Sequence, residues 1–233
     1  MKYKINIRGV LVPNEYKWFY DWFGEDCTCP SDVQKIINQL QTGDEIEVYI
    51  NSPGGVIEVG SEIYTLLRIH SDIVKIYITG EACSAASIVA MASYCEMAPT
   101  ALMMVHCVST RAEGNHNNLE HTAEVLRTAD RALCMAYVAK SKMTEEEVTL
   151  MMEKETWLTA TQAKELGLID GIMFEKTEKP LCLAAGPLFA LPSKESMEKV
   201  KLLIKEEESR ENKDSAFLLQ IKWNLLQLKG ERR

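Results

Sequence analysis

Small residues surround one serine at the start of a predicted helix. Residues 80–85 read GEACSA and follow an apolar strand pattern, so Ser84 lies where a strand turns sharply into a helix. The first N–H groups of a helix have no partner within it and lie at the positive end of its dipole, surroundings that stabilise an oxyanion. Ser84 is therefore a candidate nucleophile for attack on a carbonyl. A simple helix N-cap is the alternative. Ser87 and Ser93 should lie inside or at the end of the helix, with poorer access to free amides.

A serine nucleophile needs a base, and the chain offers four histidines. His106 directly follows an apolar strand pattern at residues 102–105, so we expect it at the same sheet edge as Ser84. His116 and His121 lie in or beside a polar helix start, and His70 ends a helix. His106 is therefore the favoured base.

A carboxylate should fix the histidine tautomer. Glu155 precedes Thr156 and Trp157, which should anchor its segment in the core. Asp170 follows Gly167, Leu168 and Ile169 in a predicted terminal turn. Glu155 and Asp170 both remain candidates for the third catalytic group.

The glycine pair in residues 50–55 (INSPGG) could bring a backbone amide into the same site. Without side chains at Gly54 and Gly55, a substrate can approach closely and an amide can face it. A plain turn explains two glycines equally well. A phosphate loop is disfavoured, because residues 56–58 read VIE instead of supplying the required Lys and Ser or Thr.

Strand patterns alternate with helix patterns along the first three quarters of the chain. This alternation predicts an α/β fold with a mainly parallel sheet, whose functional groups gather at the carboxyl ends of the strands. The expected strands are an edge-like one at 2–10 and others at 45–50, 73–79 and 100–105. The expected helices are capped by residues 30–32, follow residue 55, begin at residues 85 and 118, follow Thr144, and start with the stretch 158–163. Helix 85–94 is expected to be rich in small residues, helix 118–140 is amphipathic, and Thr144 and Glu147 fit a capping box.

The chain is expected to divide into a compact domain at residues 1–175 and a connector with a charged, partly helical tail at 176–233. Pro and Gly punctuate the connector, and the tail carries two apolar groups separated by the polar stretch EEESRENKDS. We interpret the tail as a flexible or docking appendage, with a dedicated partner-binding helix as the alternative.

Composition excludes several classes of protein. The 233 residues are 46% hydrophobic and 26% charged, as in globular proteins. The net charge of -8 argues against nucleic acid as a partner. The seven cysteines show no paired metal spacing, the opening MKYKINIRG reads as a strand instead of a secretory leader, and no apolar run is long enough for a membrane span. We expect a cytoplasmic protein without a metal or other cofactor.

The motifs INSPGG, GEACSA, MMVH and ETWLTATQAKELGLID, in that order, resemble the Clp protease proteolytic subunit family, ClpP, over residues 4–172. The resemblance implies a ClpP/crotonase-like spiral of repeated ββα units and a serine endopeptidase that itself uses no ATP. It implies Ser84 as nucleophile, His106 as general base, and the amides of Gly55 and Ala85 as the oxyanion hole. Glu155 occupies the place of the family's usual aspartate, and Asp170 is held in reserve.

Other implications concern partners. The resemblance implies protein or peptide substrates and a homo-oligomeric ring, heptameric or stacked, with helix 118–140 as the contact between rings. The family's N-terminal pore segment, which helps to engage a Clp ATPase, has no counterpart before the first strand, and Cys107 and Val108 stand where a proline is usual. The ETWLTA motif and the tail are most similar to phage and prophage ClpP-like proteases, which implies cleavage of capsid or scaffold proteins during head maturation.

Two other functional classes stay open. A crotonase-like acyl-CoA enzyme would use paired amides on the same fold without a Ser–His pair. A catalytically idle scaffold would use the tail to bind a partner and Ser84 only as a helix cap.

Overall fold

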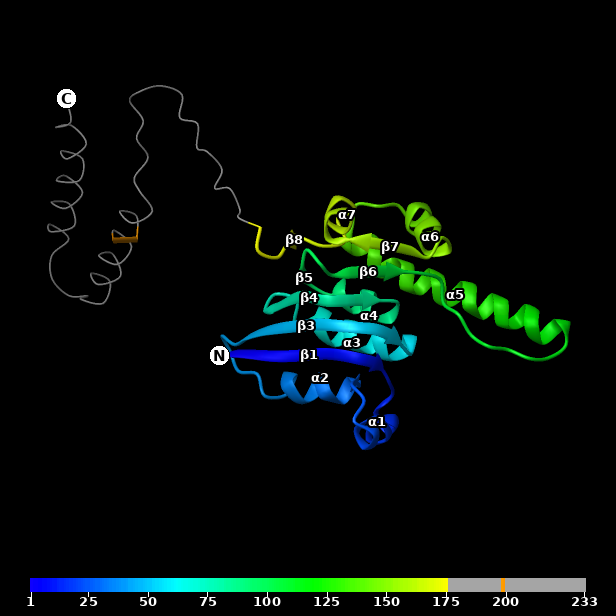
Figure 1. Ribbon diagram of the computed structural model, residues 1–233, viewed down its shortest axis with the longest axis horizontal. Coiled ribbons are helices and arrows are strands. Elements are labelled where there is room, and N and C mark those ends of the chain that lie inside the picture. Colours follow the sequence, from blue (N-terminus) through cyan, green and yellow to red (C-terminus); the bar gives the residue numbers. More distant parts are fainter. Residues whose placement is uncertain (176–197, 200–233) are drawn as a thin grey trace, which may run out of the picture. The chain divides into compact units, whose positions relative to one another are not determined.

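A computed structural model describes residues 1–175 and 198–199 of the chain (Figure 1). The chain divides between residues 177 and 178 into two units, and of the second unit only residues 198 and 199, which are helical, are described. The predicted connector and tail therefore lie outside the described residues, apart from these two. The boundary at residue 175 stays a prediction.

An eight-stranded, mainly parallel sheet forms the centre of the first unit. Its path runs β2-β1-β3-β4-β5-β8, and β6 pairs parallel with the end of β4 and antiparallel with β7. This arrangement confirms the predicted α/β class. The strands are β1 (Lys2–Leu11), β2 (Cys27–Thr28), β3 (Glu45–Gly55), β4 (Val74–Cys83), β5 (Tyr94–Met97), β6 (Leu102–Val105), β7 (Thr156–Thr159) and β8 (Gly171–Ile172).

Helices complete the described unit. Helix α2 contacts β1, α3 contacts β3, and α4 contacts both β3 and β4, which places these three helices together along the sheet (Figure 1). The helices are the 3-10 turn η1 (Asn14–Tyr16), α1 (Lys17–Phe23), α2 (Pro30–Ile37), α3 (Ile57–Ile69), α4 (Ala85–Ala90), α5 (His116–Lys140), α6 (Glu145–Glu153) and α7 (Ala160–Glu165). None of the described helices is long and apolar enough to cross a membrane.

Alternating strand residues form the core. Ile46, Val48 and Ile50 of β3 are fully buried, and Ile63 and Leu67 of α3 are buried with them. Each such side chain contributes about 1.5–3 kcal/mol when it leaves water. This core fixes the positions of β3 and β4. The loops that follow these two strands are therefore held in place as well.

Strands β3 and β4 run further than the sequence predicted. The expectation that β3 ends at Ile50 is wrong, because the strand continues to Gly55 beside the end of β1 after a shift in register. The expected stop at Gly80 is also wrong. Here β4 continues to Cys83, and the side chain of Asn51 accepts a hydrogen bond from the Glu81 amide at 3.1 Å.

The predicted helix 85–94 is too long. Helix α4 ends at Ala90, and residues from Tyr94 onward form β5, a strand that the sequence analysis missed. Tyr94 pairs with Lys75 at the beginning of β4, and the Ser93 hydroxyl lies 2.8 and 2.7 Å from the carbonyl oxygens of Ser71 and Val74. These contacts favour the extended backbone over another helical turn.

Two helices are unusually exposed. Helix α5 extends beyond the sheet (Figure 1), and its apolar residues Leu119 and Val125 are 45% and 53% exposed. Helix α1, which the sequence analysis did not predict, exposes the aromatic side chains of Trp18 and Trp22. The predicted capping box at Thr144 and Glu147 is confirmed at the start of α6.

Candidate active site

Ser84 occupies a tight turn between β4 and α4. Its backbone has φ 54° and ψ -127°, a left-handed conformation that costs free energy for a residue with a β-carbon. The turn is held by the Ser84 amide, which donates a 2.9 Å hydrogen bond to the carbonyl of Met104 in β6. The side chain is partly exposed and lies at the beginning of α4. This backbone conformation holds the hydroxyl outside the core, at a position that a substrate can reach.

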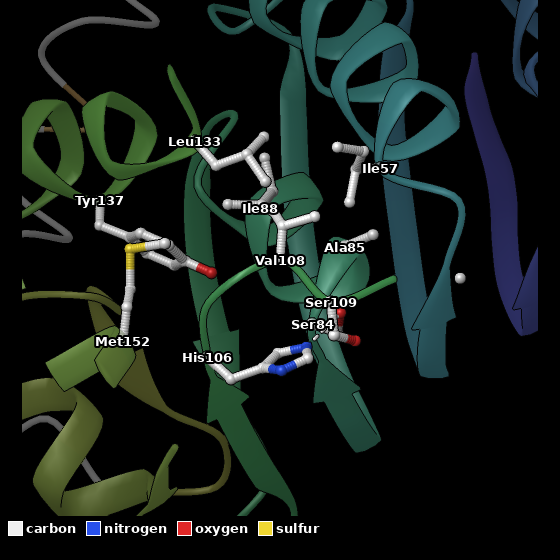
Figure 2. A pocket seen from close by; sticks show the side chains of 11 residues that line it. Ile57, Ser84, Ala85, Ile88, His106, Val108, Ser109, Leu133, Tyr137 and Met152 are labelled. Carbon is white, nitrogen blue, oxygen red and sulfur yellow. Dashed lines mark hydrogen bonds between the residues drawn. The ribbon is translucent and has the colours of Figure 1, made fainter. Parts of the chain in front are cut away.

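The structure brings His106 directly to Ser84. Strand β6 pairs parallel with β4 up to the pair Cys83 and Met104, so the residues that follow both strands emerge at one edge of the sheet. The Nε2 atom of His106 lies 2.8 Å from the Oγ atom of Ser84, and Figure 2 shows the imidazole facing the hydroxyl. With Nε2 unprotonated, the hydroxyl donates to the imidazole, which is the arrangement that general-base activation requires.

The other histidines lie elsewhere. His70 is the C-terminal cap of α3, His116 is the first residue of α5, and His121 follows within α5. None of them lines the cavity beside Ser84.

Glu155 lies next to His106 in the strand register. The antiparallel pairing of β6 with β7 ends at Val105 and Thr156, so Glu155 directly precedes the residue opposite Val105 while His106 directly follows Val105. In the structure, the Glu155 carboxylate accepts a 3.4 Å hydrogen bond from the indole N–H of Trp157. Within residues 1–175, no hydrogen bond joins His106 to a carboxylate.

Asp170 lies far from this pair. Its carboxylate accepts a 2.7 Å hydrogen bond from the Cys95 amide and forms an ion pair with Lys140. Cys95 pairs with Ile76 near the beginning of β4, whereas Ser84 follows the end of the same strand. Seven residues of extended strand separate these ends, a span of about 23 Å. Asp170 is therefore not placed to orient His106.

The glycine pair packs against the serine turn. Ser52 is fully buried, and its hydroxyl donates to the Gly9 carbonyl at 2.6 Å and accepts from the Gly54 amide at 3.1 Å. Gly55 lines the same cavity as Ser84 and Ala85. Ala85 is the first residue of α4, so its N–H has no partner within the helix.

Cysteines flank both site residues but are poor nucleophiles. Burial, with a further contribution from Glu81, raises the pKa of Cys83 to about 12. Burial and the Asp130 carboxylate raise the pKa of Cys107 to about 11. Because the thiolate is the reactive form of cysteine, both thiols stay protonated and unreactive near neutral pH. The hydroxyl of Ser84 is therefore the favoured nucleophile in this part of the chain.

A cavity of about 70 Å³ adjoins Ser84 and His106 (Figure 2). The sequence analysis missed its apolar walls, because their residues come from four helices and from strand-to-helix junctions. One signal was available: Tyr137 carries a polar group on the apolar face of α5. The other side chains around the cavity are Ile57, Ile88, Val108, Ser109, Leu133 and Met152.

Comparisons with known proteins identify the family of this chain. The family model described as Clp protease matches residues 32–176, more than half of the chain. The chain belongs to the Clp protease family. Members of this family are serine-type peptidases, and the expected family resemblance is confirmed.

Clp protease proteolytic subunits are similar to more than half of this chain. An ATP-dependent Clp protease proteolytic subunit of Bacteroides fragilis strain ATCC 25285 is 29% identical over 143 residues, which cover 60% of this chain and 69% of the relative. The same-named protein of Bacteroides thetaiotaomicron is 29% identical over 143 residues, which cover 60% of this chain and 65% of the relative. The matched segment thus includes about two thirds of each Clp subunit.

Proposed function

We propose that this chain is a serine endopeptidase that cleaves protein substrates with Ser84 as nucleophile and His106 as general base. The observation that carries the proposal is the 2.8 Å contact between Ser84 Oγ and His106 Nε2 at the start of a helix. A serine that served only as a helix cap would bond to the amides of the first turn. Ser84 makes no side-chain cap bond of this kind.

The proposed reaction has two stages. His106 takes the Ser84 proton as Oγ attacks the peptide carbonyl, and the amides of Gly55 and Ala85 donate hydrogen bonds to the resulting oxyanion. His106 then gives the proton to the leaving amine, and an acyl group stays on Ser84. Water enters, loses a proton to His106 and attacks the acyl carbon. The bond between this carbon and Ser84 Oγ then breaks, His106 returns its proton to Oγ, and the carboxylic acid is released.

Glu155 is the proposed third group. Its place beside His106 in the strand register supports this role, which requires its carboxylate to leave the indole of Trp157. Catalytic hydrogen bonds are often incomplete in the free enzyme and tighten when substrate binds. In this role, Glu155 would accept the Nδ1 proton of His106 and stabilise the imidazolium.

Assembly and partners follow as further parts of the proposal. We infer a homo-oligomeric ring in which the exposed apolar side chains of α5, among them Leu119 and Val125, contact another ring. Substrates would be supplied in the cytoplasm by a Clp ATPase or, in a phage-type role, would be capsid or scaffold proteins. The two Bacteroides relatives are ATP-dependent Clp protease proteolytic subunits, which supports the first of these routes.

Labelling with a fluorophosphonate tests the nucleophile directly. The full chain is treated with the probe, and intact-mass analysis and peptide mapping locate the modified residue. We expect one label on Ser84, none in Ser84→Ala, and full labelling in Ser61→Ala, a control serine exposed on α3. A wild-type protein that stays unlabelled would contradict the proposal and favour an acyl-CoA enzyme or an idle scaffold.

A further inference from the structure

A buried chain of hydroxyl groups connects α5 to the nucleophile. The phenol oxygen of Tyr137 lies 2.7 Å from Ser87 Oγ, and Ser87 Oγ lies 2.6 Å from the carbonyl oxygen of Ser84. A carbonyl can only accept, so the single Ser87 proton is donated to Ser84. Tyr137 must therefore donate to Ser87, which fixes the direction of the whole chain.

This chain holds the Tyr137 ring in one place. Tyr137 is 2% exposed and Ser87 is fully buried, so water does not compete for either hydroxyl. Burial raises the pKa of the Tyr137 phenol, which keeps the group protonated and able to donate. Releasing the ring would leave a buried polar group without its partner, which is unfavourable. The ring is thus a rigid wall.

The wall faces the space beside the nucleophile. In Figure 2, Tyr137 and Met152 bound the cavity on one side, with Leu133 and Ile88 nearby and Ser84 and His106 at its mouth. In a serine peptidase, the cavity beside the nucleophile receives the side chain of the residue whose carbonyl is attacked. The size and polarity of the cavity then determine which substrate side chains can bind in it.

Both properties of the cavity restrict that side chain. Its volume of about 70 Å³ is about half of the ~150 Å³ that holds a benzene molecule in an engineered protein cavity. A space of this size favours a small side chain over an aromatic one. A charged side chain would lie unpaired among Ile57, Ile88 and Leu133, which is strongly unfavourable.

We propose that Tyr137 is a specificity-determining residue that limits the side chain on the acyl side of the cleaved bond to a short uncharged one, with alanine preferred over leucine and phenylalanine. The inference rests on the proposed function, because it assigns the cavity to the substrate of Ser84. Ser87 acts through Tyr137 and is a positioning residue.

Peptidyl phosphonate esters test this assignment without requiring turnover. Three probes that differ only in carrying the alanine, leucine or phenylalanine side chain next to phosphorus are reacted with the full chain. Intact mass gives the rate of Ser84 modification, and each rate is divided by the rate with a plain fluorophosphonate. We expect the alanine probe to react about 10-fold faster than the leucine probe, and the phenylalanine probe to react slowest.

Two substitutions of Tyr137 separate the ring from its hydroxyl. Tyr137→Leu removes part of the wall and should shift the leucine-to-alanine rate ratio at least 10-fold toward leucine. Tyr137→Phe keeps the ring but removes the hydrogen bond that holds it, so it should weaken the preference for alanine less than Tyr137→Leu does. If circular dichroism shows that Tyr137→Leu does not fold, Tyr137→Met provides the same enlarged space with an adaptable side chain.

The outcomes distinguish the two proposals. Equal rates for all three side chains in the wild type, or an unchanged ratio in a folded Tyr137→Leu protein, would overturn the assignment of Tyr137 while Ser84 is still labelled. Failure of the plain fluorophosphonate to modify wild-type Ser84 would overturn the proposed function, and the specificity assignment with it.

Discussion

A methyl group on Gly54 would lie 2.8 Å from the β-carbon of Ser84. It would also lie 2.5 Å from the carbonyl oxygen of Cys83 and 3.0 Å from the Ala85 nitrogen. Gly54 has φ +93°, a conformation that L side chains rarely adopt. The end of β3 therefore supports the serine turn through backbone contact, and both glycine properties, its small size and its positive φ, are needed there.

Substitution of Gly54 should consequently displace the nucleophile. We expect Gly54→Ala to lower fluorophosphonate labelling of Ser84 at least 100-fold, because a shift of about 1 Å can cost that much in rate. Gly43→Ala is the matched control, since Gly43 has φ +91° and an added β-carbon would meet no atom of the described residues within 4 Å. The control should lose only about 1–2 kcal/mol of stability from its backbone and keep normal labelling. Equal labelling of both variants would show that the contact with Ser84 is unimportant.

Glu155 should matter for turnover more than for folding. We expect Glu155→Gln to lower kcat for peptide hydrolysis by about 10²–10⁴-fold, because the amide cannot stabilise the imidazolium of His106 as a carboxylate does. Thermal unfolding should change little, since among residues 1–175 the carboxylate is bonded only to the indole of Trp157, at 3.4 Å. Glu153→Gln removes an exposed carboxylate two residues earlier and serves as control. A Glu155→Gln enzyme with normal kcat would leave His106 without a carboxylate partner.

The sequence predicted the Ser84 and His106 pair for a physical reason. Both residues directly follow apolar strands, and the carboxyl ends of neighbouring parallel strands meet at one edge of a sheet. The pairing of Cys83 with Met104 realises this rule. Local patterns were therefore sufficient to place two residues that are 22 positions apart.

Other features depend on tertiary contacts that local patterns do not reveal. The sequence suggested a turn at Gly54, but β3 continues through it because β1 runs alongside. The sequence pattern predicted that Tyr94 ends the preceding helix, yet this residue pairs with Lys75 and begins β5. The hydrogen bond between Tyr137 and Ser87 joins residues 50 positions apart, and no spacing rule in the sequence predicts it.

Asp170 should stabilise the fold without serving catalysis. Its ion pair with Lys140 is shielded on the lysine side only, since the Lys140 side chain is 11% exposed and the Asp170 side chain 37%. We expect Asp170→Asn to lower the free energy of unfolding by about 1 kcal/mol, because it leaves Lys140 without its counter-charge while solvent screens the pair. Urea titration measures this loss. Labelling of Ser84 should stay normal. A strong loss of labelling in the folded variant would make Asp170 a candidate for the third catalytic group again.

Buried thiols should make the protein sensitive to alkaline pH. Burial raises the pKa of Cys95 from 9.0 to about 12 and that of Cys83 to a similar value. Below pH 9 these thiols are protonated in both states, so they contribute no pH dependence. Between about pH 9 and 12 the unfolded chain releases protons that the folded chain retains, so the free energy of unfolding must fall as pH rises.

The expected slope for fully buried Cys95 approaches about 1.4 kcal/mol per pH unit within that window. Urea titrations at pH 8, 9 and 10 measure the decline, and Cys95→Ala should make it shallower because the alanine has no proton to lose. A second check uses the reactivity of the thiols, since native protein should be alkylated at pH 8 far more slowly than protein unfolded in urea. Identical pH profiles for wild type and Cys95→Ala would contradict a raised pKa for this thiol.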